Sequence, residues 1–288
     1  MDLVVGATGS LGGRIAHALL GLEHDVRALV RDPAKAGPLE AAGAQVVVGN
    51  VKDPASLDAA CSGVDVVVST ATMSKRGDDS PENVDMRGTQ NLIDAARRAG
   101  VHKFVFVSTL NASPDSPIPV FRAKGAAEEH LRQSGMDYTI IQANAFMDVW
   151  FPMLIEMPVS SGHPVTLVGE SRRRHAFVAE QDVAAFAVAA AVGNPAARNT
   201  TLAIGGPEAV TLREVVRAYE EAAGRSIPVR SVAPGEPIPG LPEQVWGFAA
   251  ALESFDSPVP MEEACRQYGV SLSNIRDFTR ATPLAART

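Results

Sequence analysis

A chain of 288 residues is longer than a typical single domain, so we expect a main domain with a smaller appended lobe. With 46% hydrophobic and 20% charged residues, the composition is that of a packed globular protein and excludes disordered, collagen-like and coiled-coil classes. The net charge of -7 repels a phosphate backbone and argues against nucleic acid as a general partner.

The two cysteines, Cys61 and Cys265, fit neither a disulfide framework nor a zinc site, and the histidines lack metal-ligand spacing. We therefore expect no bound metal. Met1 and Asp2 lead straight into a strand-like run without a signal core. The alanine-rich run 183–192 is too short to cross a bilayer, which needs roughly 20 apolar residues. These features predict a cytoplasmic protein without a membrane partner.

The first half of the chain alternates short β-branched runs with longer amphipathic ones, which indicates strand–helix–strand units on a parallel sheet. Strands are predicted at residues 3–5, 26–30, 45–48, 64–69, 103–108 and 137–142. Helices are predicted at residues 11–20, 56–60, 88–99 and 120–133. Asp53 and Pro54 suit the N-cap and first position of the second helix. The pattern predicts a doubly wound, Rossmann-type α/β domain over residues 1–150.

Beyond about Asn144 the alternation ends and prolines accumulate, which predicts a smaller, irregular lobe over residues 151–288, interleaved with the first domain. It contains predicted helices at 182–192 and 212–223, the second in a capping box of Thr211 and Glu214. A strand is predicted at 176–178. The basic run just before it, Arg172, Arg173, Arg174 and His175, is interpreted as a solvated loop, with an anion-binding or partner surface as the alternative.

The turn between the first strand and the first helix carries three glycines, Gly6, Gly9 and Gly12. The first permits a tight turn, the second lets backbone amides approach a diphosphate, and the third lets the helix pack closely on the strand. The unpaired amides and the dipole of the helix N-terminus favour an anion. We predict a dinucleotide site here, with a plain tight turn as the alternative.

The residue that follows the second strand selects between nicotinamide cofactors. An NAD site places an acidic residue there to accept hydrogen bonds from the ribose 2′-hydroxyl. This chain has Arg31, whose guanidinium can bind a 2′-phosphate, while Asp32 is expected to point elsewhere. The cofactor predicted is NADP. A solvated loop arginine is the competing interpretation.

Ligands of parallel sheets bind outside the carboxyl ends of the strands. The third strand ends at residues suited to flank adenine, the fourth near the bridging ribose, and the fifth near the nicotinamide. Ordinary turn chemistry is the competing explanation at each position. The candidates are Asn50 and Val51 after the third strand, Ser69, Thr70 and Ala71 at the end of the fourth, and Ser108 and Thr109 at the end of the fifth.

These motifs together resemble the NmrA-like group of atypical short-chain dehydrogenase/reductases, which includes quinone reductase-like and isoflavone reductase-like members. The resemblance covers most of the chain and is strongest in GATGSLGGR and DMRGTQNLIDAARRAGVHKFVFVS. It continues in ALVRDPAKA, GNVKDPASL, AKGAAEEHLRQSGMDYTII, FVAEQDVAAFAV and AIGGPEAVTLREVV. It implies that NADP is held by Arg31, by the strand ends named above, and by the glycine turn: Gly6, Thr8, Gly9, Ser10, Leu11 and Gly12.

The resemblance also implies that Lys124 hydrogen-bonds the nicotinamide ribose or takes part in proton transfer. The Tyr-x-x-x-Lys pair of the wider superfamily would need tyrosine at position 120, where this chain has Val120. Candidate replacements for the missing acid are Lys124, Ser108 and Thr109. The alternative for Lys124 is an exposed i,i+4 pair with Glu128, which would contribute only about 0.3–0.5 kcal/mol.

An apolar segment, 143–157, is the candidate wall of a substrate pocket through Phe146, Trp150 and Phe151, with ordinary core packing as the alternative. Such a pocket suits a small, hydrophobic, aromatic substrate such as a quinone, an aryl ketone or an enone. The function predicted is an NADPH-dependent reductase. The alternative is a non-catalytic NADP-binding sensor or regulatory protein. Whether the protein is a monomer or a homodimer stays open.

Overall fold

The computed structural model describes residues 1–74, 77–238, 241, 243–282 and 284. The chain divides into two compact units, and each takes several segments of the sequence. The first unit consists of Met1–Ala143, Val183–Ala203 and Arg266–Val270. The second consists of Asn144–Asp182, Ile204–Cys265 and Ser271–Thr288.

The first unit is built on a seven-stranded sheet of order β3-β2-β1-β4-β5-β6-β8. Every neighbouring pair from β3 to β6 is parallel. The strand order reverses between β1 and β4, and this is where open parallel sheets bind ligands. The predicted Rossmann-type fold is confirmed. The strands are β1 (Asp2–Val5), β2 (Val26–Val30), β3 (Gln45–Val48), β4 (Val66–Ser69), β5 (Lys103–Thr109), β6 (Asp137–Ala143) and β8 (Thr200–Ile204).

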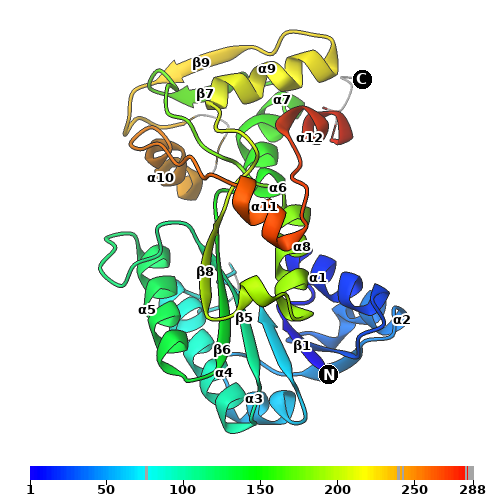
Figure 1. Cartoon of the computed structure of the whole chain (residues 1–288). Coiled ribbons are helices and arrows are strands. Elements are labelled where there is room, and N and C mark those ends of the chain that lie inside the picture. The colour runs from blue at the N-terminus through cyan, green and yellow to red at the C-terminus, as the bar shows by residue number, and fades with distance from the viewer. Residues whose placement is uncertain (75–76, 239–240, 242, 283, 285–288) are drawn as a thin grey trace. The chain divides into compact units, whose positions relative to one another are not determined.

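The central strands of this sheet are largely apolar because helices cover both faces, as in parallel sheets generally. In β1, Leu3 and Val5 join one core and the intervening Val4 is also fully buried. Helices α3 (Pro54–Cys61), α4 (Arg87–Arg98) and α5 (Pro119–Gln133) pack side by side on one face, and α1 (Ser10–Gly21) covers β1 and β2 on the other (Figure 1). The short α2 (Gly37–Ala41) precedes β3, and α8 (Glu180–Ala191) precedes β8.

The predicted capping residues of α3 are confirmed. The Asp53 carboxylate accepts a hydrogen bond from the Ala55 amide and so caps α3. The predicted helix over 88–99 is found at 87–98, but a π-helical segment, Pro81–Met86, precedes it. π-Helical turns are often found at functional sites. The sequence pattern did not indicate this one.

The second unit contains a two-stranded parallel sheet of β7 (Val165–Val168) and β9 (Val229–Val232). Its core gathers apolar side chains around Phe151, Phe177 and Tyr219. The Thr211–Glu214 capping box at the start of α9 is present. Its helices are α6 (Met147–Phe151), α7 (Met157–Ser160), α9 (Leu212–Ala223), α10 (Glu243–Ala251) and α12 (Ile275–Ala281), and α11 (Glu262–Tyr268) begins in it.

The strand predicted at 176–178 is wrong. The segment is buried, but it forms only isolated bridges at Val178, which faces Phe146, and at the preceding His175. A short buried apolar run has the same sequence pattern whether or not it finds a continuous ladder. Among the described residues, no helix is both long and apolar enough to span a membrane.

Candidate nucleotide-binding site

The turn between β1 and α1 requires its glycines for steric reasons. Gly6 has φ of +87°, and a Cβ there would lie 2.5 Å from Thr70 Oγ1. At Gly12 a Cβ would lie 2.3 Å from the Gly6 carbonyl oxygen, so only glycine allows α1 to approach the turn this closely. The Gly9 amide donates to the Gly6 carbonyl at 2.9 Å. Gly6 therefore permits the tight turn and Gly12 permits the close helix packing, as the glycine spacing predicts.

Helix α1 begins without a side-chain cap, because Gly9 occupies the N-cap position in extended conformation. Its first turn contains no acidic residue. The amides at a helix start cannot bond within the helix, and their partial positive charge favours an anion. A diphosphate in front of Gly9 could accept hydrogen bonds from these amides, because the small residues leave room for it.

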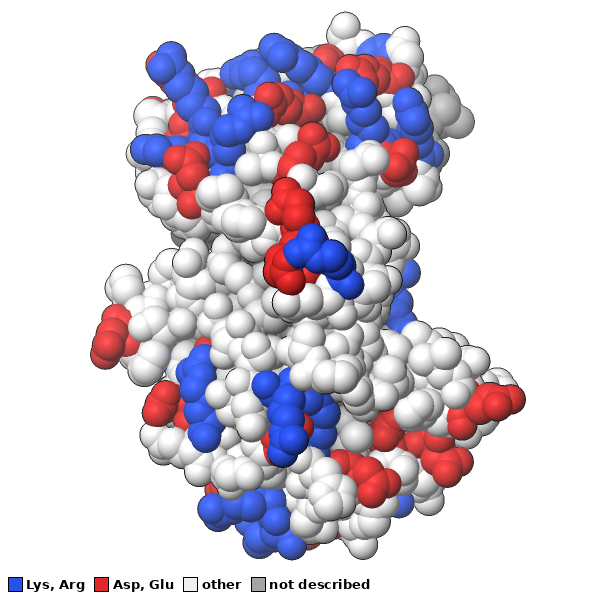
Figure 2. Space-filling view, in the orientation of Figure 1, with Lys and Arg blue, Asp and Glu red and all other residues white. Residues whose placement is uncertain are grey.

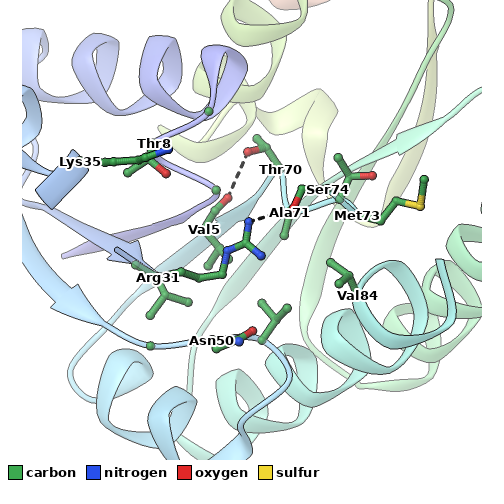
Figure 3. A pocket seen from close by; sticks show the side chains of 16 residues that line it. Val5, Thr8, Arg31, Lys35, Asn50, Thr70, Ala71, Met73, Ser74 and Val84 are labelled. Carbon is green, nitrogen blue, oxygen red and sulfur yellow. Dashed lines mark hydrogen bonds between the residues drawn. The ribbon is translucent and has the colours of Figure 1, made fainter. Parts of the chain in front are cut away.

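A cavity of about 300 Å³ opens at this turn, next to the reversal between β1 and β4. The end of each of the strands β1 to β4 contributes to its wall, and Figure 3 shows Arg31 reaching across it from β2 toward Ser74. The predicted residues that line the cavity are Gly6, Thr8, Gly9, Arg31, Asn50, Val51, Thr70 and Ala71. Lining residues that were not predicted include Lys35, Gly49, Thr72, Met73, Ser74 and Val84.

Arg31 lies at the centre of a charged cluster. Its Nη1 is 2.8 Å from Asp79 Oδ2, and the Lys52 Nζ is 2.9 Å from Asp79 Oδ1. The Ser74 hydroxyl donates to Asp79 Oδ2 at 2.7 Å. The side chain of Arg31 is 41% exposed, whereas that of Asp79 is only 1% exposed. The cation at the end of β2 therefore faces the cavity but already holds an internal anion.

The ionisation of Asp79 follows from these neighbours. Burial alone would raise the pKa of its carboxyl group, but hydrogen bonds from Lys52, Ser74 and Arg31 outweigh burial and hold the pKa well below its usual range. Asp79 is thus a carboxylate throughout the neutral pH range. Asp32, by contrast, accepts a hydrogen bond from the Ala34 amide and caps the short turn Pro33–Lys35, and it is not one of the residues that line the cavity.

The wall next to Arg31 is formed by the residues after β3. Asn50 Oδ1 accepts from the Lys52 amide at 3.1 Å, which fixes the turn. Val51 is buried and packs against α4, where a Cβ at Gly88 would lie 2.7 Å from Val51 Cγ2. On the other side, Thr70 Oγ1 donates to the Val5 carbonyl at 3.1 Å (Figure 3). A small apolar side chain and an amide thus flank the cavity beside its cationic end.

Several expected contacts lie outside the cavity wall. Ser10 is exposed and Leu11 is half-buried in the first turn of α1, and Gly12 packs against Gly6. Ser69 is fully buried, and its hydroxyl has no hydrogen-bond partner within the described part of the chain. Neighbouring strand residues point to opposite faces. After the end of β4, Thr70 and Ala71 line the cavity and Ser69 does not.

Ser108 is buried in a polar network at the end of β5. Its hydroxyl donates to Glu128 Oε1 at 2.5 Å, and the Gln142 amide donates to the same carboxylate at 3.0 Å. Arg132 Nη2 lies 2.9 Å from Glu128 Oε2. Glu128 thus receives donors from three side chains. The single proton of Ser108 is committed to this network, whereas the neighbouring Thr109 is half-buried.

Lys124 is buried too, so the interpretation as an exposed pair with Glu128 is wrong. Its Nζ lies 3.3 Å from Asp85 Oδ1 and 3.4 Å from the Val107 carbonyl oxygen. It also lies 5.2 Å from the centre of the Phe106 ring. Lys124 and Glu128 share a face of α5, but Lys124 contacts Asp85 of the π-helical segment and Glu128 contacts Ser108 of β5.

Asp85 connects Lys124 to the cavity wall. Its carboxylate is fully buried and accepts hydrogen bonds from Thr72 Oγ1 at 2.6 Å and from the Met73 amide at 3.0 Å. Both donors line the cavity. Sequence reasoning missed Asp85, although it opens the motif DMRGTQNL. An acidic residue just before a helix beside a buried strand end was the available signal.

The aromatic residues expected to contact substrate lie in the second unit. Phe151 is fully buried and makes edge-to-face contacts with Phe177 at 5.1 Å and Phe278 at 5.6 Å between ring centres. It is a core residue, because other rings surround it. Trp150 stacks on Phe248, with ring centres 3.3 Å apart. Trp150 and Phe146 are both half-buried.

The basic run of the second unit is neutralised by acidic partners. Arg172 pairs with Glu170, Arg173 Nη1 lies 3.1 Å from Asp256 Oδ2, and Arg174 Nη2 lies 3.1 Å from Glu214 Oε2. On the face of this unit shown in Figure 2, basic and acidic side chains are interleaved. The three arginines are exposed, as expected of a solvated loop, whereas His175 is buried.

Comparison with known proteins places this arrangement in a family. Residues 6–194 match the model of the NAD(P)H-binding family. The chain is 36% identical over 233 residues to an NAD(P)H azoreductase from Xenophilus azovorans, covering 81% of this chain and 77% of the relative. It is 34% identical over 230 residues to the photosystem II assembly factor Ycf39 from Synechocystis, covering 80% and 70%.

A solved structure agrees at the level of the fold. The triphenylmethane reductase of Citrobacter, crystallised with NADP(H), superposes with a TM-score of 0.81 at 22% identity, over 98% of this chain and 99% of the other. The chain belongs to the NAD(P)H-binding family. The resemblance to atypical short-chain dehydrogenase/reductases, inferred from the motifs, is confirmed.

Proposed function

We propose that this protein is an NADPH-dependent reductase that passes a hydride to a small hydrophobic acceptor with an aromatic ring system. The observation that carries the proposal is the position of Arg31. It follows β2, where an NAD site has an acid, and faces a cavity that opens on the glycine turn. Oxidoreductase chemistry fits the azoreductase relative.

The residues present fit this cofactor. The start of α1 would hold the diphosphate, because Gly6 and Gly9 leave its amides accessible. Arg31, with Lys35 and Lys52 nearby, would bind the 2′-phosphate, and Asn50 and Val51 would flank the adenine. When bound, NADPH supplies the hydride, and the protein supplies orientation and electrostatics. We retain Ser10, Leu11, Gly12, Thr70 and Ala71 as proposed residues of the same site, but not Ser69, which is fully buried.

Lys124 is the proposed catalytic or ribose-binding residue. Its ammonium group has three N–H donors, and the contacts with Asp85 and Val107 account for two of them. The third would serve the nicotinamide ribose or the proton that the acceptor takes up. Ser108 is a weaker candidate, because its only donor already serves Glu128.

The acceptors we propose are quinones, aryl ketones, enones and azo compounds, the last by analogy with the azoreductase. All are flat and apolar, which suits contact with aromatic side chains. We propose Phe146 and Trp150 as substrate contacts. We no longer propose Phe151, because it is enclosed in the core of the second unit.

The competing proposal is a non-catalytic NADP-binding protein. One observation favours it: Val120 stands where the superfamily has its acidic tyrosine, and the Ser108 hydroxyl is engaged elsewhere. A positioned acid typically contributes roughly 10²- to 10⁴-fold in rate. Relatives named as photosystem II assembly factors fit a role other than turnover.

Turnover measurements separate the two proposals. The purified protein is mixed with NADPH and a panel of quinones, aryl enones and azo dyes, and nicotinamide absorbance is followed. We expect oxidation with at least one class. Replacing the proposed donor by Lys124→Met should lower that rate by about tenfold or more.

The matched control is Lys103→Met, which removes another buried lysine of the first unit. Lys103 is the first residue of β5, at the end of the strand opposite to Ser108, and pairs with Asp137 and the Ala197 carbonyl. Its loss should therefore leave the rate per folded molecule unchanged. Silence of the wild-type protein across the panel, with NADPH binding intact, would favour the non-catalytic proposal.

A further inference from the structure

The cluster around Arg31 contains both a receptor for an anion and an anion that fills it. Arg31, Lys52 and Ser74 come from three different segments and direct donors at one carboxylate, that of Asp79. Together they engage both of its oxygens. The acid is 1% exposed, while Arg31 is 41% exposed and lines the cavity.

The neighbouring acid, Asp78, differs from Asp79 in its exposure and in its partners. Asp78 contacts Lys52 at 2.5 Å, and its side chain is 76% exposed. Asp79, next along the same loop, is instead turned inward onto the guanidinium. The loop thus directs one particular carboxylate at the arginine that follows β2.

We propose that the Asp79 carboxylate occupies the binding place of the 2′-phosphate, so that NADPH must displace it from Arg31 whereas NADH need not. Asp79 is then a residue that determines cofactor preference, by competing with the group that Arg31 selects. This inference rests on the proposed use of Arg31 in NADPH binding.

The charges of the two anions support competition. A phosphate monoester carries about -1.5 to -2 charges near neutral pH and three acceptor oxygens, so it can take the donors that Asp79 uses. The two anions cannot share one guanidinium without strong repulsion. Binding of NADPH therefore includes the cost of separating Asp79 from its partners. NADH has a hydroxyl group in place of the 2′-phosphate and does not compete with Asp79 for these donors.

Calorimetric titration of NADPH and of NADH into wild-type protein and Asp79→Asn tests the proposal. The amide keeps the size of the side chain but removes its charge. We expect NADPH to bind about tenfold more tightly, in line with the loss of a competing charge-assisted bond, and NADH to change by less than about twofold. Asp78→Asn is the matched control and should alter NADPH binding by about twofold or less, because Asp78 is 76% exposed and pairs with Lys52 at the surface.

Three outcomes have different meanings. Weaker or unchanged NADPH binding in Asp79→Asn would overturn the proposal, because Asp79 would then orient Arg31 or have no influence on it. A gain that persists in full when Arg31→Ala is added would also overturn it, since the competition must act through Arg31. Wild-type protein that binds neither nucleotide would overturn the proposed function itself. If Asp79→Asn does not fold, Asp79→Ser provides the same comparison.

Discussion

Two buried acids each pair with a cation in the first unit, but the surroundings of the two pairs differ. Asp79 pairs with Arg31 at the cavity, and the arginine is 41% exposed. Asp85 pairs with Lys124 between the π-helical segment and α5, where the acid is 0% exposed and the lysine only 8%. The first pair has one member in solvent, and the second has none.

This difference decides what each pair can do. A cation that reaches solvent can exchange its partner for a ligand, because water compensates the charge during the exchange. A fully buried pair cannot exchange, since removing one member leaves an unpaired charge in a medium of low polarity. The Arg31 pair is therefore suited to exchanging its acid for a ligand. The Lys124 pair stays intact, and its Asp85 holds Thr72 and Met73 of the cavity wall.

The substitution with the largest expected effect is Asp85→Asn. It leaves the Lys124 ammonium buried without its counter-charge, and breaking such a pair typically costs about 3–5 kcal/mol. Urea unfolding should show a loss of free energy in this range.

The matching double variant, Asp85→Asn with Lys124→Met, removes both charges and should recover much of the stability. Exposed ion pairs typically contribute less than about 1 kcal/mol. A loss this small in the single variant would show that the buried Asp85–Lys124 pair does not differ from a surface pair.

The opposite behaviour is expected of Arg31→Ala. Its free energy of unfolding should change by less than about 1 kcal/mol, because the side chain is partly in solvent. Binding of NADPH should weaken by about 1.5–3 kcal/mol, the usual contribution of a hydrogen bond to a charged group, while NADH binding changes little. Calorimetric titration measures both affinities. Equal losses for the two cofactors would show that Arg31 does not distinguish the 2′-phosphate.

The sequence indicated the cation of each pair, Arg31 from the strand pattern and Lys124 from the family resemblance, but neither of the two acids. The run Val26–Val30 is apolar except for Arg27 and is followed by Arg31, so both the strand and the residue after it could be located from local pattern alone. The glycine spacing likewise follows from short-range sterics. Asp79 and Asp85 lie between β4 and α4, in a stretch without periodicity. Their partners come from distant parts of the chain, and no local rule pairs them.

The second unit shows the same limit. Strands β7 and β9 are four residues long and pair across more than sixty residues of sequence, so neither was predicted. Phe151 could equally have lined a pocket or filled a core, because both environments favour an apolar ring. The contacts with the rings of Phe177 and Phe278 show that Phe151 is a core residue.

A smaller effect tests whether burial also fixes ionisation in the second unit. His175 is 2% exposed, with Nε2 2.7 Å from the Leu252 carbonyl oxygen and Nδ1 2.8 Å from Ser257 Oγ. Burial lowers the pKa of its imidazole, and the hydrogen bond to Leu252 and the charges of Asp256 and Glu253 oppose this only in part.

Because the pKa of His175 is lower in the folded than in the unfolded chain, the unfolded chain binds more protons as the pH falls below 6.5, the unperturbed value. The stability that neutral His175 contributes is complete above that pH and is lost toward the lower, folded pKa. Urea unfolding between about pH 8 and about pH 5 should therefore show a falling free energy. His175→Gln cannot titrate and should fall less steeply. Parallel profiles would mean that the imidazole has the same proton affinity in both states, despite its burial.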